Sequence, residues 1–261
     1  MKIAGGHNNI MMGYQAGLQV SSGYYNVILG YRAADAANCS YQIAIGYEAL
    51  SAVTTTTQNV AIGNYTLAKV GSTGTGNVAI GNNALDANTT ANDNTALGWG
   101  SLTANTTGAQ NIAIGTDALK VNSSADNNIA IGYQSLDANT SGANNTALGT
   151  SALGANTTAS NNVAVGYQSM DANTIGEYNV AIGNYSLDAN TTASYNVGVG
   201  LHALGANTTG TPNTAVGTHA LGANTTGGSN VAVGEGALEL NTTAAWNTAV
   251  GASALDANTT G

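Results

Sequence analysis

One pattern of apolar and polar positions recurs along most of the chain: Asn, an aliphatic residue or Thr, a small residue, an aliphatic residue, then Gly. Residues 179–195, NVAIGNYSLDANTTASY, show the complete unit, and positions are numbered here from its Asn. The units begin at Asn9, Asn26, Gln42, Asn59, Asn77, Asn94, Asn111, Asn128, Asn145, Asn162, Asn179, Asn196, Asn213, Asn230 and Asn247. From Asn77 onward the units follow one another with a constant 17-residue step.

A unit of this length is too short for the helical pairs of helical repeat proteins. Positions two to four alternate with period two, as in a strand, and Gly ends the run. Positions eight to eleven predict a second short strand, and Asn-Thr-Thr-Gly predicts a turn. We therefore predict an all-β chain: a parallel β-solenoid of about fifteen coils, stacked at ~4.8 Å.

The repeats also define the organisation of the chain. Residues 1–8 form a lead-in, residues 9–76 hold four less regular repeats, and residues 77–261 hold eleven regular ones, in one continuous solenoid. Solenoids end in polar caps, and this sequence stops inside a repeat. That predicts a fragment of a longer fibre, or end-to-end stacking into filaments.

Positions two, four and nine are predicted to form a narrow core, because they carry the large aliphatic side chains. Each such side chain contributes roughly 1.5–3 kcal/mol when buried. The predicted core residues include Val163, Val165, Ile129, Ile131, Leu136, Leu153, Leu187 and Leu204.

Position three points to the opposite side of the strand, yet it is Ala or Gly in thirteen of the fifteen units. A solvent-facing column should be polar and variable, so we predict that this column packs against another chain. The candidates are Ala113, Ala130, Ala147, Ala164, Ala181 and Ala215. Position five is always Gly, which predicts a positive φ or a close backbone approach, for example at Gly115, Gly132, Gly149, Gly166 and Gly183.

The Asn columns are best explained by structure, because stacked side-chain amides hydrogen-bond along a solenoid. The Asn-Thr-Thr sequences match a glycosylation motif, but sugars on coils ~5 Å apart would collide. A turn and an Asn ladder therefore explain them better.

Composition excludes several functions. The chain has 261 residues, four Lys+Arg, 35 Gly, no Phe and a net charge of −9, so it lacks the basic surface that binds nucleic acid or anionic membranes. No apolar run reaches the ~20 residues of a membrane span, and residues 1–7 do not read as a signal peptide. Cys39 is the one cysteine, and we expect it to behave as a small hydrophobe.

Candidate chemistry is sparse. A solenoid arranges like groups in rows, whereas catalysis needs unlike groups at one point, so we expect no enzyme, no cofactor and no metal site. His202 and His219, both at position seven, should stack about 5 Å apart. Carboxylates recur at position ten, where we expect a solvated edge. Aromatic residues after the glycine suit either corner packing or surface contact, the latter for Tyr133, Tyr167 and Trp99.

The run Asn-Val-Ala-Ile-Gly followed by x-x-Ala/Ser resembles the YadA-like head repeats of trimeric autotransporter adhesins and the related repeats of phage tail fibres. This resemblance covers positions one to nine of each unit, across residues 9–261. It implies a left-handed β-roll, a homotrimer around one axis, and an adhesive or fibrous role. The usual unit is nearer fourteen residues, and the added Asn-Thr-Thr-Gly looks more like repeats of phage fibre proteins.

The resemblance thus favours a virion appendage, or another extracellular surface, that attaches to a host glycan or protein without inserting into a membrane. A bacterial adhesin head is the first alternative. An ice-binding solenoid is the second, because Thr-Thr columns such as Thr191 and Thr192 could order water. Ser and Ile interrupt those columns, for example at Ser141 and Ile175.

Overall fold

A computed structural model describes residues 6–36, 38–52, 57–69 and 74–259 of the chain. The chain consists of two compact units, Met1–Asn128 and Ile129–Gly261, which are called unit 1 and unit 2 here. In the described ranges the regular structure is entirely β-strand. No described segment forms a helix of the length and hydropathy that a membrane span requires.

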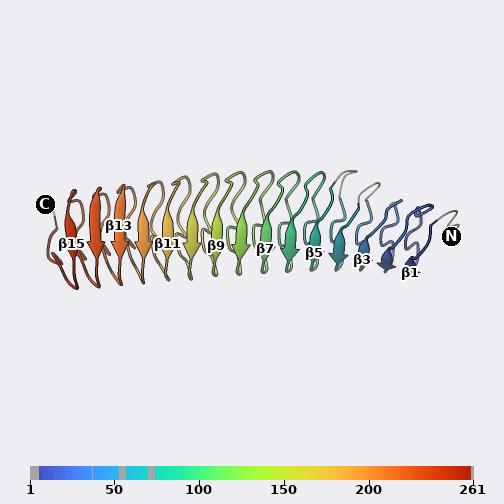
Figure 1. Cartoon of the computed structure of the whole chain (residues 1–261), viewed down its shortest axis with the longest axis horizontal. Helices are drawn as coiled ribbons and strands as arrows, with labels where there is room; N and C mark the ends of the chain where they lie inside the picture. Colours follow the sequence, from blue (N-terminus) through green and yellow to red (C-terminus); the bar gives the residue numbers. More distant parts are fainter. Residues whose placement is uncertain (1–5, 37, 53–56, 70–73, 260–261) are drawn as a thin grey trace. The chain divides into compact units, whose positions relative to one another are not determined.

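Unit 1 contains one short strand per coil, and each strand pairs in parallel with the next (Figure 1). The pairing is in register with the repeat, so that Val27 lies beside Ile43. The strands are β1 (Ile10–Met12), β2 (Val27–Leu29), β3 (Ile43–Ile45), β4 (Val60–Ile62), β5 (Val78–Ile80), β6 (Thr95–Leu97) and β7 (Ile112–Ile114).

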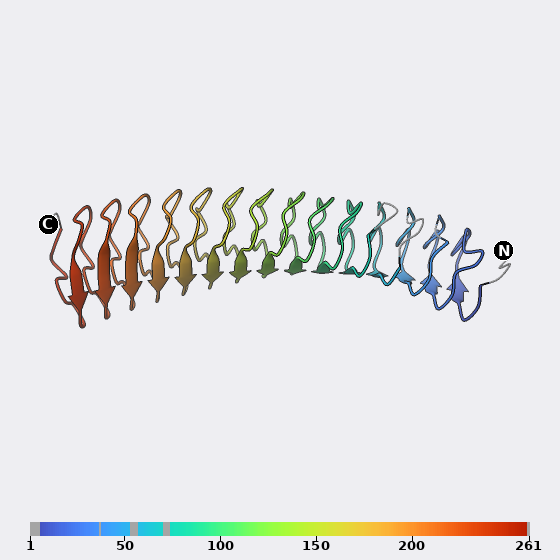
Figure 2. The same ribbon diagram turned by 45° about the horizontal axis from the view of Figure 1, so that its top comes forward.

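Unit 2 repeats this arrangement with a constant 17-residue register, in which Val180 lies beside Val197. Its strands are β8 (Ile129–Ile131), β9 (Thr146–Leu148), β10 (Val163–Val165), β11 (Val180–Ile182), β12 (Val197–Val199), β13 (Asn213–Val216), β14 (Asn230–Val233) and β15 (Thr248–Val250). Figure 2 shows the rest of each coil looping away from the row of strands. The predicted fold class, an all-β parallel solenoid with a 17-residue period, is confirmed for both units; its handedness stays a prediction.

The second strand that we predicted at positions eight to eleven is wrong, because this segment is a turn. Positions seven and nine take left-handed backbone angles, as in Tyr185 (φ 56°) and Leu187 (φ 53°). The segment still bonds to its neighbours: the Leu187 N–H donates to the Ala203 carbonyl at 3.0 Å. β-branched residues tolerate left-handed angles least, and position nine is never Val, Ile or Thr.

The glycine at position five is required for two reasons. At Gly166 φ is +135°, and an added Cβ would lie 2.6 Å from the carbonyl carbon of Gly183 in the next coil. The predicted positive φ is confirmed at all five candidates, Gly115, Gly132, Gly149, Gly166 and Gly183.

The inner and outer faces of the strand are the reverse of our prediction. Val163, Val165, Ile129 and Ile131 lie on the outside and are only half-buried. The predicted inter-chain alanines are instead fully buried inside their own coils: Ala113, Ala130, Ala147, Ala164, Ala181 and Ala215.

The physical reason is the thinness of the coil. Position three faces positions eight and nine of the preceding coil across the shared interior: a Cβ added at Gly198 would lie 2.7 Å from Ser186 Oγ and 3.4 Å from Leu187 Cγ. The column is small because it packs against the opposite wall of the coil, and no second chain is needed to explain it. The predicted core leucines, which form that wall, are fully buried: Leu136, Leu153, Leu187 and Leu204.

Two Asn columns complete the interior. At position one, the Asn179 backbone N–H donates to Oδ1 of Asn162 at 3.0 Å, and Asn179 Nδ2 donates to the Ala193 carbonyl at 2.9 Å. At position twelve, Asn190 Nδ2 donates to Oδ1 of Asn173 at 2.9 Å and to the same Ala193 carbonyl at 3.0 Å. The predicted Asn ladder is confirmed. Asn190, to which a sugar would be attached in the glycosylation motif Asn190-Thr191-Thr192, is fully buried.

Candidate functional site

The outer face of the strands exposes apolar side chains in both units. Position two is Ile, Val or Thr, position four is Ile, Val, Leu or Met, and none of these side chains is buried. The exposed fraction is 41% at Ile182 and 43% at Leu148, and it rises to 69% at Met12 and 71% at Val250. Neither column contains a charged residue. We call this surface the aliphatic face; extended exposed apolar patches mark interaction sites.

Position four consists of Met12, Leu29, Ile45, Ile62, Ile80, Leu97 and Ile114 in unit 1, and of Ile131, Leu148, Val165, Ile182, Val199, Val216, Val233 and Val250 in unit 2.

Aromatic columns border the aliphatic face in unit 1. After the strands, Tyr14, Tyr31 and Tyr47 stack at 5.2 and 5.1 Å between ring centroids, with interplanar angles of 16° and 6°. Before the strands, Tyr25 stacks on Tyr41 at 5.4 Å. Because the rings cover one another's faces, these columns present ring edges to solvent, and stacking a sugar on a ring face is possible only at their ends.

The three predicted surface-contact residues are all exposed: Tyr133, Tyr167 and Trp99. Tyr167 meets Tyr185 edge-on at 5.4 Å, and Lys120 lies 5.9 Å above the Trp99 ring. Exposure is what contact with a receptor requires, but such contact stays a prediction.

The Thr-Thr pairs lie in a bend rather than on a strand. The first Thr of each pair bonds to the next coil: Thr208 Oγ1 donates to the Thr225 carbonyl at 3.1 Å, and Thr225 Oγ1 to the Thr242 carbonyl at 3.0 Å. These hydroxyls are therefore committed to the neighbouring coil, which disfavours a flat array that orders water.

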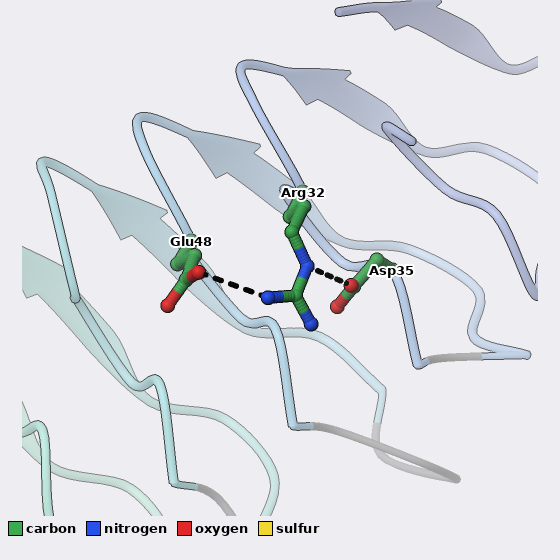
Figure 3. Close-up of polar contacts among 3 residues, drawn as sticks. All are labelled: Arg32, Asp35 and Glu48. Carbon is green, nitrogen blue, oxygen red and sulfur yellow. Dashed lines mark hydrogen bonds and ion pairs between the residues drawn. The ribbon is translucent and has the colours of Figure 1, made fainter. Parts of the chain in front are cut away.

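Charge is distributed unequally. In unit 1 each described cation meets a carboxylate: Arg32 contacts Asp35 at 2.8 Å and Glu48 at 3.2 Å (Figure 3), while Lys69 meets Asp86 and Lys120 meets Asp117. Residues 129–261 contain no Lys or Arg at all.

The carboxylates at position ten are mostly half-buried, so the edge that we predicted to be solvated is so only in part: Asp256 is exposed, and Asp35 is buried. Burial raises the pKa of Asp171 above its usual range. Burial also raises the pKa of Asp188, partly offset by His202. These side chains carry a desolvation cost in their charged form.

One hollow on unit 2 brings unlike groups together. Asp188, His202, Gly205, Ala206, His219 and Gly222 line it. The predicted stack of His202 and His219 is confirmed, with 5.3 Å between centroids, and Tyr185 stacks on His202 at 4.9 Å. Across the described ranges, no three His, Cys, Asp or Glu side chains are arranged to hold a metal ion.

Sequence reasoning missed both the aliphatic face and the hollow. A signal for the first was present: in the two coils where position three is large, Met11 and Ile28, position nine is small, Gly17 and Ala34. Such compensation indicates that both positions share one interior. For the hollow, the signal was Gly at position ten in two successive units next to two histidines.

Comparisons with protein-family models, with curated proteins and with solved structures give no match. The site is therefore interpreted from its own geometry.

Proposed function

We propose that this chain is a structural and adhesive segment of an extracellular fibre, such as a phage tail fibre or another virion appendage. In this proposal copies of the chain associate through the aliphatic face, and the other faces of the coils are displayed for attachment to a host surface. The single observation that supports it best is that position four carries a large apolar residue in every repeat and is not buried in either unit.

A second copy of the chain is the partner that suits this face. Successive rungs are spaced by one coil, ~4.8 Å, and a partner with the same spacing can match them rung by rung. Removing the columns from water contributes about 25 cal/mol per Å² of apolar surface. The absence of charge along positions two and four also resembles the depletion found at interface cores. The number of copies, three, comes from the resemblance to head repeats.

A structural role is consistent with how the repeat distributes chemistry. Asn, Thr and Tyr side chains form rows of like groups, and these rows bond mainly to one another along the coils. Such rows suit a stiff display surface better than a reaction centre, and we propose no catalytic activity.

Sedimentation equilibrium of the full chain tests the assembly. We expect a trimer for the natural sequence, and monomers for the double variant Val165→Lys, Ile182→Lys, because two charges on nearby rungs cannot be desolvated in the interface. Thr192→Lys is the control, since it adds charge on an exposed column outside the aliphatic face.

Circular dichroism should show the same β content for all three proteins. A natural chain that stays monomeric at every concentration would contradict the proposal, as would a Thr192→Lys variant that dissociates as fully as the double variant. Attachment is tested with a glycan microarray probed with the assembled protein, where we expect binding to a defined set of surface glycans.

A further inference from the structure

The hollow on unit 2 arises from missing side chains. Position ten carries Asp, Glu, Thr or Lys in many coils, but it is Gly205 and Gly222 in two successive ones. A Cβ at Gly205 would lie 3.3 Å from Asp188 Oδ1 and 3.3 Å from the His202 carbonyl. Gly205 and Gly222 form the floor of the hollow. The Asp188 carboxylate lies next to this floor, in the space that a position-ten side chain fills in other coils.

The groups free to meet a ligand are few and known. The backbone of the floor is occupied: Gly222 N–H donates to the His219 carbonyl at 3.0 Å, and Ala206 N–H donates to the Gly222 carbonyl at 3.1 Å. Stacking with Tyr185 and with each other covers faces of the His202 and His219 rings. What remains is the Asp188 carboxylate, which also accepts hydrogen bonds from its own backbone N–H and from that of Ala189, together with the edges of two imidazoles and the methyl group of Ala206.

Charge decides which ligand suits these groups. Residues 129–261 carry seven Asp or Glu and no Lys or Arg, so this unit repels anions and concentrates cations. Among the groups that line the hollow, only His202 and His219 could offset the charge of Asp188. An ammonium group has three N–H donors and no acceptor, which fits a carboxylate beside imidazole nitrogens.

We propose that this hollow binds an organic ammonium group, with Asp188 accepting its N–H groups and the imidazoles of His202 and His219 flanking it. The carbon skeleton of the ligand lies against Ala206. Such a group belongs to amino sugars with a free amine and to linear diamines. The site is formed by positions seven, ten and eleven and uses no residue of the aliphatic face, so it does not depend on the proposed assembly.

Titration of the full chain with three probes, followed by NMR shifts of the histidine rings, tests the proposal. Glucosamine and putrescine represent the two sources, and N-acetylglucosamine is the neutral match of the first. We expect binding of at least one amine, about tenfold or more tighter than N-acetylglucosamine, that weakens several-fold as salt rises. Tighter binding by glucosamine identifies an amino-sugar site, and tighter binding by putrescine a linear-amine site. Equal binding of N-acetylglucosamine, or binding of neither amine, would overturn the proposal.

Matched variants separate a site from general attraction. Asp188→Asn and Asp137→Asn remove the same charge from position ten, but only Asp188 lines the hollow. We expect roughly tenfold weaker amine binding for the first and less than about twofold for the second. Gly205→Thr should abolish binding by filling the floor, with circular dichroism unchanged, because Thr103 occupies position ten in unit 1. An equal loss of amine affinity in Asp188→Asn and Asp137→Asn would contradict the assignment of this hollow as the binding site.

Discussion

The two units share one fold but differ in what accompanies it. Unit 1 has repeats of unequal length between Asn9 and Asn77 and four Lys+Arg against six Asp+Glu. Unit 2 keeps one repeat length throughout, with seven carboxylates and no Lys or Arg. Both nevertheless stack their strands in the same register.

Ion pairs therefore do not hold the coil together, since unit 2 forms without Lys or Arg. What the units share is the interior: a small residue opposite a large one, and Asn side chains that bond from coil to coil. Repeat proteins gain their stability from such neighbour contacts. The comparison separates interior positions, where we expect large effects of mutation, from surface charges, where we expect small ones.

The largest effect is expected from Leu187→Ala in unit 2. Leu187 is fully buried and faces Gly198 of the next coil, so truncation should cost about 2–5 kcal/mol of unfolding free energy. Guanidinium unfolding followed by circular dichroism measures this. A cost below ~1 kcal/mol would show that the leucine column is not the core.

Unit 1 suggests how to rescue this variant. There Ile28 at position three accompanies Ala34 at position nine, the reverse of Ala181 and Leu187. Adding Ala181→Ile to Leu187→Ala should recover more than about 1 kcal/mol, because the two positions share one cavity. Ala181→Ile alone should destabilise by overpacking. If the loss of unfolding free energy in the double variant equals the sum of the losses in the two single variants, positions three and nine do not compensate for each other.

The same pair of positions shows what the sequence could and could not predict. Periodicity predicted the solenoid, its register and the Gly turns, because each is encoded in every repeat. Alternation alone leaves open which side of a strand faces inward, and the large Val and Ile side chains favoured the wrong one. The prediction of a second strand failed because the left-handed backbone angles at Tyr185 and Leu187 leave no trace in the pattern of apolar and polar residues. The hollow is lined by residues of three successive coils that differ from the consensus repeat. Reading the sequence as one consensus repeat hides such differences between coils.

An intermediate effect is expected from the internal amides. Asn179→Ala leaves the Ala193 carbonyl without one of its donors and the Asn196 N–H without its acceptor, so about 1–3 kcal/mol should be lost. Gln42 holds position one in unit 1, and its Oε1 accepts the Asn59 N–H at 3.1 Å. Asn179→Gln should therefore be milder than Asn179→Ala. Equal unfolding midpoints for the two variants would contradict a hydrogen-bonding role.

A smaller effect should appear in the pH dependence of unit 2. Burial raises the pKa of Asp171 and of Asp188, so the folded state favours their protonated forms. The stability that they contribute is complete below the unfolded pKa near 3.8 and is lost as pH rises through the raised folded values. Asp171→Asn should raise the unfolding midpoint at pH 7 and make stability depend less on pH. The gain in unfolding free energy should be less than about 1 kcal/mol, because the Asp171 side chain is half-exposed. A lower midpoint at pH 7 would contradict the sign.

The smallest effect is expected from the most visible ion pairs of unit 1. Arg32→Ala removes both contacts drawn in Figure 3, with Asp35 and with Glu48, yet the Arg32 side chain is exposed and its charge is well solvated. Asp35 itself is buried, but a pair whose cation is exposed gains little, since ordering the arginine offsets the attraction and salt screens it. The unfolding free energy should fall by less than about 1 kcal/mol at roughly physiological salt, because the arginine end of both pairs is open to solvent. A loss as large as that of Leu187→Ala would mean that unit 1, unlike unit 2, depends on its charges.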